Sequence, residues 1–323
     1  MRVSTSMIFN NGTLGIQNRQ SDLFKVQNQL SNGRRILTPE DDPIGASEAL
    51  QVTQSKGVNK QFLDNQANAQ SQLTYLEGTL GSVSDQFLRI GELAAEAANP
   101  TLNASQRGMI AAELKERRDS LIGLANTQDG TGLYIFGGFK SSIKPFGPAV
   151  AQASPPVLPP TYGLAGTTYV PYNGDAGRQA LQVTSSNDIA TSENGLDVFM
   201  QVKDSSGNAI GRSVFDSLQN LINNIDGSSP YSAATQAQAQ SEIRAGLNHV
   251  STIRASVGAR QNSLDSLTST GQDVALQYDT RLSDLQDLDW TEAISRFTNY
   301  KTQLEAAQLS FKQVSQMSLF NIL

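Results

Sequence analysis

The amino-acid sequence predicts a mainly α-helical fold, an elongated rod of long antiparallel helices formed by both chain ends, with a small β-rich inserted outer domain. Apolar residues recur at steps of three and four over long stretches, which is typical of paired amphipathic helices. Only 38% of the 323 residues are hydrophobic, which suits an elongated helical body better than one compact globule. Residues 142–212 interrupt the helical period with many Pro and Gly residues.

The last stretch, residues 290–323, is predicted to be one continuous helix because it contains neither Gly nor Pro. Its apolar stripe is narrow, since polar side chains occupy most of the other positions. The stripe consists of Trp290, Ala293, Phe297, Tyr300, Leu304, Ala307, Phe311, Val314 and Met317. A helix of this kind cannot bury its stripe against itself, so it needs a partner.

The stretch from residue 16 to residue 37 has the same spacing and is the predicted partner. Its stripe contains Ile16, Leu23, Val26, Leu30 and Leu37, with Arg19 and Gly33 at the two remaining positions. Residues 1–37 carry five basic residues and one acidic residue, whereas residues 284–323 carry three basic and five acidic residues. Matching heptads and opposite charge favour pairing of the two chain ends. The alternative is that each end packs on a helix of its own half.

The inner helices are predicted from the same period. Asp42 followed by Pro43 is a helix start, because a carboxylate caps free N–H groups and proline fits the first turn. A helix of residues 43–98 follows, and Pro39 is expected to end the first helix before it. The acidic run of residues 40–42 is explained by capping and solvation without a metal ion.

Three further helices are expected at residues 105–128, 214–225 and 233–288. The last of them equals residues 43–98 in length and period, so these two long helices should lie side by side. Short β structure is expected at residues 133–136, as a hairpin between Gly-containing turns. In the insertion, strands are expected at residues 167–172, 180–184 and 196–203, with a turn at 204–208. The insertion is expected at the end of the rod remote from the termini.

Five segments follow from these elements. Residues 1–37 form an N-terminal coiled-coil assembly helix, and residues 289–323 form its C-terminal counterpart. Residues 38–141 and 213–288 form the two parts of a helical rod domain, the first ending in the hairpin. Residues 142–212 form the β-rich outer domain.

Catalytic chemistry has little basis in this sequence. There is no cysteine, and His249 is the single histidine, so neither a zinc site of the usual type nor a Cys–His dyad can form. No phosphate-binding or nucleophile motif occurs in a supporting context. We therefore expect neither an enzyme nor a cofactor.

Composition also argues against two classes of partner. The net charge is −6 and basic residues are not clustered beyond Arg34 and Arg35, which argues against nucleic-acid binding. No stretch approaches the length of a membrane span, and the N-terminus does not resemble an ordinary secretory signal peptide.

Both chain ends carry motifs of a known family. The sequence LSNGRRILTPEDDPIGASEAL of residues 30–50 and FTNYKTQLEAAQLSFKQVSQMSLFNIL of residues 297–323 resemble the two ends of bacterial flagellins. The opening MRVSTSM and the run LYIFGGFK of residues 133–140 resemble the hook-associated members of that family rather than flagellin proper. The resemblance covers residues 1–140 and 230–323.

The resemblance implies a place and a set of partners. It implies export by the flagellar type III apparatus without a cleaved signal, and an extracellular position at the hook–filament junction. It implies one ring of copies of this chain between another hook-associated protein and the first flagellins. It also implies a cytoplasmic export chaperone that holds the C-terminal segment.

The leading functional hypothesis is a structural adaptor that assembles through its terminal helices. The expected assembly interface comprises Leu23, Val26, Leu30, Ile294, Phe297, Tyr300, Leu304, Phe311 and Val314. Because isolated helices with so narrow a stripe are marginal in water, both termini are expected to be largely disordered in the monomer. Two alternatives remain: a flagellin that forms the bulk of the filament, and a binding module whose insertion recognises a ligand.

Overall fold

A computed structural model describes residues 5–151, 168–203, 212–227 and 230–320. The chain divides into two compact units. The terminal unit comprises Met1–Lys60 and Gln272–Leu323, and the central unit comprises Gln61–Gly271. The terminal unit is therefore built from two stretches that lie far apart in the sequence, whereas the central unit is one continuous stretch.

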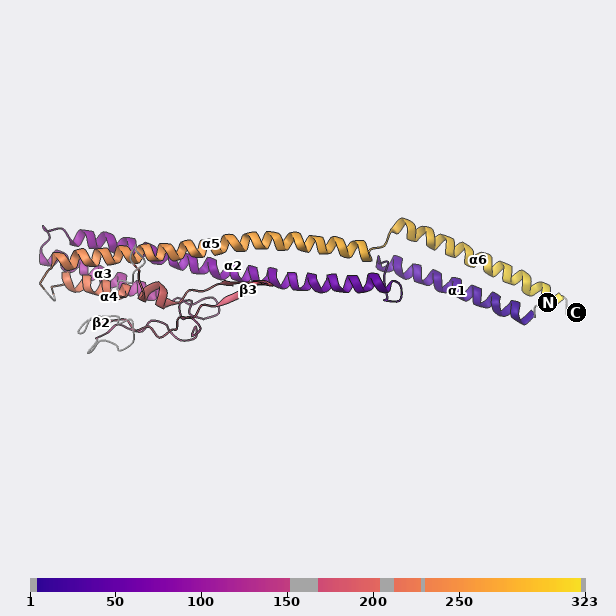
Figure 1. The fold of residues 1–323 in the computed structure, drawn as a ribbon, viewed down its shortest axis with the longest axis horizontal. Helices are drawn as coiled ribbons and strands as arrows, with labels where there is room; N and C mark the ends of the chain where they lie inside the picture. Colours follow the sequence, from indigo (N-terminus) through magenta and orange to yellow (C-terminus); the bar gives the residue numbers. More distant parts are fainter. Residues whose placement is uncertain (1–4, 152–167, 204–211, 228–229, 321–323) are drawn as a thin grey trace. The chain divides into compact units, whose positions relative to one another are not determined.

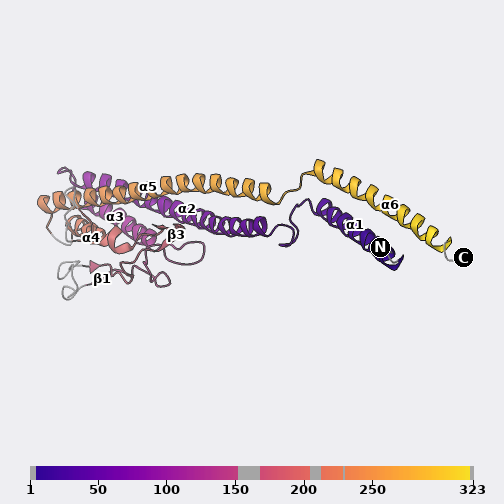
Figure 2. The same ribbon diagram turned by 45° about the vertical axis from the view of Figure 1, so that its right-hand side comes forward.

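The structure confirms a mainly helical fold whose long helices pair. The α-helices are α1 (Thr5–Asn32), α2 (Pro43–Ala97), α3 (Ala104–Ala125), α4 (Val214–Ile225), α5 (Ala233–Gln286) and α6 (Trp290–Phe320). Figures 1 and 2 show α2 running beside α5, and α1 running beside α6. The pairing of the two chain ends, and of the two long inner helices, is as predicted.

The first helix ends earlier than expected. Gly33 adopts a φ of +66°, a left-handed conformation that glycine accepts readily and that commonly terminates helices. The helix therefore stops at Asn32, and Leu37 lies in the following loop rather than on the apolar stripe. The expectation that Pro39 ends this helix was wrong, because the glycine acts six residues before it.

Local capping explains where other helices begin. The Asp42 Oδ1 atom accepts a hydrogen bond from the Gly45 N–H at 2.9 Å, directly at the start of α2. Asn103 with Gln106, and Ser213 with Asp216, form reciprocal capping boxes at α3 and α4. The predicted bounds of α4 agree with the structure, and those of α2 differ by one residue at its C-terminus.

The core of the central unit lies between α2 and α5 and continues onto α3 and α4. The apolar stripe of α2 is fully buried over much of its length, from Ala69 to Ala97. At Gly246 on α5, an added Cβ would lie 2.9 Å from the Phe87 ring, so the two helices approach closely there. Arg254 on α5 pairs with Glu77 on α2 at 2.6 Å on the surface of this contact.

Four buried aromatic side chains join the helices to the segments between α3 and α4. They are Phe136, Phe146, Phe199 and Phe215, and the ring centroids of their contacting pairs lie 5.2 to 5.7 Å apart. Most of these pairs are edge-to-face, which suits the quadrupoles of aromatic rings. The insertion thus contributes to the hydrophobic core of the central unit.

The β structure is smaller than predicted. Strand β3 (Ala180–Thr184) lies where it was expected and pairs antiparallel with β4 (Asn187–Ala190). Strand β2 (Thr168–Tyr169) pairs with β1 (Val150–Ala151), so only part of the predicted strand at residues 167–172 forms. The predicted turn at residues 204–208 lies outside the described residues.

Two predicted β elements were wrong. Residues 196–203 contain a π-helical turn, η1 (Leu196–Met200), because Asn194 Oδ1 accepts the Asp197 N–H at 2.7 Å and begins a helical turn there. At residues 133–136 there is a single antiparallel bridge, between Gln128 and Tyr134, in place of a hairpin ladder. The Asp129 carboxylate accepts the N–H groups of Thr131 and Leu133, which closes a compact loop instead.

The insertion lies along the flank of the long helices, and not only beyond their end as expected. Asn65 and Gln66 on α2 donate side-chain hydrogen bonds to the carbonyls of Gln182 and Val183 on β3, each at 2.8 Å. These carbonyls belong to a two-stranded sheet, whose edges leave backbone groups free to bond to a neighbouring helix.

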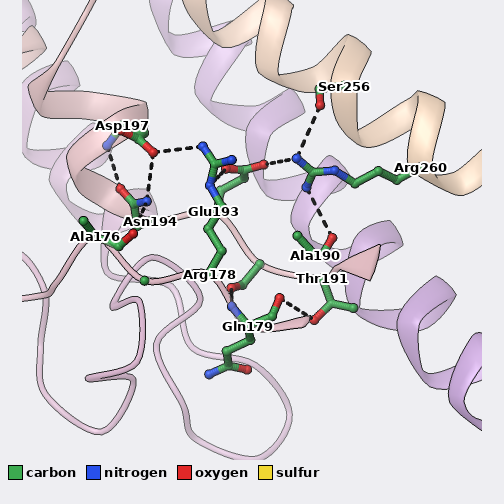
Figure 3. Close-up of polar contacts among 12 residues, drawn as sticks. Ala176, Arg178, Gln179, Ala190, Thr191, Glu193, Asn194, Asp197, Ser256 and Arg260 are labelled. Atoms are coloured by element: carbon green, nitrogen blue, oxygen red, sulfur yellow. Dashed lines mark hydrogen bonds and ion pairs between the residues drawn. The ribbon is translucent and has the colours of Figure 1, made fainter. Parts of the chain in front are cut away.

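A buried carboxylate ties the insertion to α5. The Glu193 side chain is 3% exposed and lies between two arginines, with Arg260 of α5 at 2.8 Å and Arg178 of the insertion at 3.0 Å. Figure 3 shows Arg178 also reaching Asp197, and Arg260 reaching the Ala190 carbonyl. Two positive charges around one buried carboxylate offset the cost of removing it from water.

We expect Glu193→Gln to destabilise the docking of the insertion. The amide removes the negative charge that both arginines share, at a cost of about 2 kcal/mol of unfolding free energy, since both arginines are partly exposed. Urea unfolding followed by circular dichroism measures the change. Glu92→Gln is the matched control, because Glu92 pairs with Arg89 on the exposed surface. Equal stability of both variants would show that the ion pairs of Glu193 with Arg178 and Arg260 do not hold the insertion.

Candidate assembly surfaces

The terminal unit is built on the contact between α1 and α6. The rings of Phe9 and Phe311 lie 4.9 Å apart, at the end of the pair remote from the interhelix loops. An added Cβ at Gly12 would lie 2.6 Å from the Phe311 ring, so only glycine lets this ring lie on the α1 backbone. The predicted stripe of α6 thus has its partner within the same chain.

Ion pairs do not carry this pairing. Among the described residues, no salt bridge joins α1 to α6. Lys25 instead pairs with Asp41 at 2.7 Å, Arg35 with Asp42 at 3.1 Å, and Arg296 with Glu292 of its own helix. The charge difference between the two chain ends is real, but the seam consists of apolar contacts. Exposed ion pairs contribute little in any case.

The loops that follow α1 and α5 are clasped together. The Arg35 N–H donates to the Gln286 carbonyl at 2.7 Å, and the Leu288 N–H donates to the Gly33 carbonyl at 3.1 Å. The Arg35 guanidinium adds a bond to the Leu285 carbonyl at 2.9 Å and its pair with Asp42. We call residues 33–42 with residues 285–289 the clasp. It fixes both helix breaks at the same level.

The acidic run of residues 40–42 organises this clasp. The Asp41 carboxylate pairs with Lys25 and also accepts the N–H groups of Leu37 and Thr38, which together lower its pKa to about 2. The pKa of Asp42 is also lowered, first by the hydrogen bond from the Gly45 N–H and then by Arg35. The described residues contain no cluster of three potential metal ligands, here or elsewhere. Capping and ion pairing account for these carboxylates.

The terminal unit has a thin core. Its buried apolar side chains, among the described residues, are Val26, Ala49, Leu288 and Ala293. All four lie near the clasp, so no apolar side chain described in the outer part of the α1–α6 pair is buried. Large apolar side chains remain exposed instead, namely Met7, Phe9, Leu14, Phe24, Trp290, Ile294, Leu309 and Val314. Such an exposed apolar surface is typical of an interaction site.

The nine residues predicted to form the assembly interface fall into two groups. Val26 is buried, and Leu23, Leu30, Phe297, Tyr300, Leu304 and Phe311 are half-buried. Ile294 and Val314 are exposed, with 55% of Ile294 accessible to solvent. The heptad stripe therefore mainly marks the seam within the chain, where its half-buried members still present apolar surface.

Sequence reasoning missed the apolar side chains outside the stripe. Phe24 and Leu309 lie off the heptad positions, and both are more than half exposed. A second set of apolar residues beside a heptad stripe was the available signal, because a helix that pairs on two sides needs two apolar faces.

Comparison with known protein families identifies both helical ends of the chain. The bacterial flagellin N-terminal helical region matches residues 3–141, and the bacterial flagellin C-terminal helical region matches residues 240–323. The chain belongs to the bacterial flagellin family. It is a structural protein of that family and not an enzyme, and the family resemblance of both chain ends is confirmed.

The relatives of this flagellin-family chain extend over its whole length. It is 30% identical to flagellar hook-associated protein 3 of Escherichia coli (strain K12), covering 100% of this chain and 99% of that protein. It is 29% identical to flagellar hook-associated protein 3 of Salmonella typhimurium over 100% of this chain and 99% of the relative.

A solved structure supports the fold of this family member. The structure of a putative flagellar hook-associated protein from Vibrio parahaemolyticus has a TM-score of 0.64 at 21% identity. The match covers 76% of this chain and 100% of the Vibrio parahaemolyticus chain. Across the described residues, no helix is long and apolar enough to cross a membrane.

We expect the clasp to loosen in acid. The folded pKa of Asp41, about 2, lies below its ordinary value of 3.8, so its contribution to stability is fully present above that value. It is lost as the pH falls from about 4 through 2. The protection factors of the Leu37 and Thr38 amides, measured by NMR hydrogen exchange and corrected for the intrinsic effect of pH, should fall over this window.

In the Asp41→Asn variant, the Leu37 and Thr38 amides should be less protected from exchange already at neutral pH, and their protection should show no acid transition. Asp22→Asn is the control, because the Asp22 side chain is partly exposed and its ion pair among the described residues is with Arg19 of the same helix. A normal acid transition in Asp41→Asn would show that another group controls the clasp.

Proposed function

We propose that the chain is an adaptor subunit at the flagellar hook–filament junction, which joins a hook-associated protein to flagellin. The observation that carries the proposal is the thin core of the α1–α6 pair together with its exposed apolar side chains. A pair of helices in this state is stabilised by neighbouring subunits. Similarity to hook-associated proteins 3 along the whole chain favours the junction over the bulk filament.

We assign the five segments accordingly. Residues 1–37 and 289–323 are the assembly helices, residues 38–141 and 213–288 are the helical rod domain, and residues 142–212 are the outer domain. The clasp lies close to both predicted boundaries between assembly helices and rod domain, which supports this division.

The proposed partners follow from this position. Copies of the chain form a ring, with another hook-associated protein on one side and flagellin on the other. A cytoplasmic chaperone holds the C-terminal segment before export by the type III apparatus. The exposed apolar side chains of α6 support such a chaperone, because they need protection from water before assembly.

Assembly then works by folding on binding. In the monomer the termini are largely disordered, since the α1–α6 seam buries too little apolar surface to hold two isolated helices. Neighbouring subunits supply the missing surface. Protease-resistant termini in dilute monomer would contradict this step.

The position of the protein along an intact flagellum tests the proposal. A labelled antibody should give one band at the distal end of the hook. Label along the whole filament would identify a flagellin instead. Purified protein provides the second readout, because a flagellin forms long filaments by itself and a junction subunit does not.

We expect Leu304→Asp and Phe311→Asp to prevent incorporation into the flagellum. A carboxylate on the half-buried seam opposes both the α1–α6 contact and the added contacts of neighbours. The central unit should unfold at an unchanged urea concentration, since neither residue belongs to it.

Gln308→Asp is the matched control for these variants. It adds the same charge to an exposed position of the same helix, so incorporation should stay normal. Normal junctions in Leu304→Asp or Phe311→Asp cells would remove the seam from the assembly surface.

A further inference from the structure

We infer that neighbouring copies of this chain also contact each other through the central unit, with Phe139 of one copy seated in a groove along α2 of the next. This inference rests on the proposed function as a ring subunit, and names one contact within that ring. The two halves of the contact are described in turn.

The first half is an exposed aromatic side chain on a tightly held loop. Phe139 is 69% exposed, in contrast to the fully buried Phe136 three residues earlier. Its N–H donates to Asp175 Oδ1 at 2.9 Å, and the same oxygen accepts the Gly177 N–H at 2.8 Å. Gly138 has a φ of +68°, and a Cβ there would clash with Asp175.

The ring of Phe139 is held as well as its backbone. It lies against Gly177, where an added Cβ would overlap the ring. A large apolar side chain that is both exposed and fixed loses little conformational entropy when it is buried by a partner. These are the properties of an anchor residue in a protein interface.

The second half is a shallow, open groove along the exposed side of α2. Its volume is about 680 Å³, and Ser71, Tyr75, Gly78 and Ser82 of α2 line it together with Leu124 and Thr127. Apart from the neighbouring backbone of α2 itself, no atom of the chain lies within 4 Å of an added Cβ at Gly78. Packing within the chain therefore does not require this glycine, which costs helix stability and keeps the groove open.

A second copy is the occupant that the chain itself suggests. A closed ring requires a heterologous contact, in which one patch of each copy meets a different patch of the next. The central unit carries both an apolar anchor and an open groove. Lys144 lies five residues after the anchor, and Asp85 lies one turn beyond the groove; neither forms an ion pair within the described residues. Their opposite charges favour the same pairing.

Cross-linking tests the contact directly, because the natural chain has no cysteine. One copy carries Lys140→Cys, at an exposed position directly after the intact Phe139, and a co-expressed copy carries Ser82→Cys. Isolated flagella are treated with a short bis-maleimide. A covalent dimer of the two variants should form only when both are present. Absence of this dimer from flagella that contain both variants would overturn the inference.

Two substitutions separate the groove from folding. Gly78→Leu fills the groove and should abolish the cross-link, while the melting temperature stays constant or rises by roughly a few degrees. Gly91→Leu is the matched control on the same helix, since an added Cβ there also meets no atom within 4 Å. Gly91→Leu should give the same melting temperature as Gly78→Leu, but the amount of cross-linked dimer should not decrease.

The anchor has its own control. Phe139→Ala should reduce the amount of the protein retained in flagella by roughly tenfold, as expected for an anchor residue. Met109→Ala removes another exposed apolar side chain of the central unit and should have no effect. Unchanged retention of Phe139→Ala would overturn the inference.

The antibody label separates failure of this contact from failure of the proposed function. A normal band at the junction without any cross-linked dimer rejects the groove contact alone. Absence of the band from the junction rejects the proposed function, and the ring contact with it.

Discussion

The narrow apolar seam between α1 and α6 is the constraint on which the terminal unit depends. It brings the two ends of the chain together through contacts such as that of Phe9 with Phe311. Among the described residues, the apolar side chains that it buries, such as Val26 and Ala293, lie near the clasp. The hydrophobic effect scales with the area removed from water, so a seam of this width leaves the pair dependent on other surfaces. In the function proposed above, stability within the chain and assembly outside it draw on the same residues.

The central unit, in contrast to the terminal unit, has an extensive hydrophobic core. Its long helices bury continuous stripes, and four aromatic rings join them to the insertion. The buried Glu193 carboxylate also forms ion pairs with Arg178 and Arg260. A unit with its own core can stay folded while the terminal helices exchange their surroundings. This division suits a protein that must be soluble before assembly and firmly held after it, and it leaves the exposed Phe139 on a rigid support.

Helical elements were predictable where period and capping agreed. Asp42 with Pro43, and the apolar spacing of residues 214–225, gave helix bounds within one residue. Elements that depend on one particular side-chain hydrogen bond were not predictable. Residues 196–203 were expected to form a strand, but the Asn194 side chain accepts the Asp197 N–H and begins a π-helical turn there. Of the predicted interface residues, Ile294 and Val314 are exposed, whereas the burial of Val26 depends on the position of α6.

The sequence by itself determined the helices, their pairing and the family, because heptad spacing and terminal motifs are properties of local sequence. It also determined the absence of thiol chemistry, since the chain has no cysteine. Only the tertiary structure decided where the insertion lies, because the contacts that hold it join residues far apart in the sequence. Gln66 bonds to Val183, and Glu193 pairs with Arg260. The tertiary structure also decided which apolar side chains remain exposed. Exposure depends on how far neighbouring helices cover each face, and no local pattern encodes that distance.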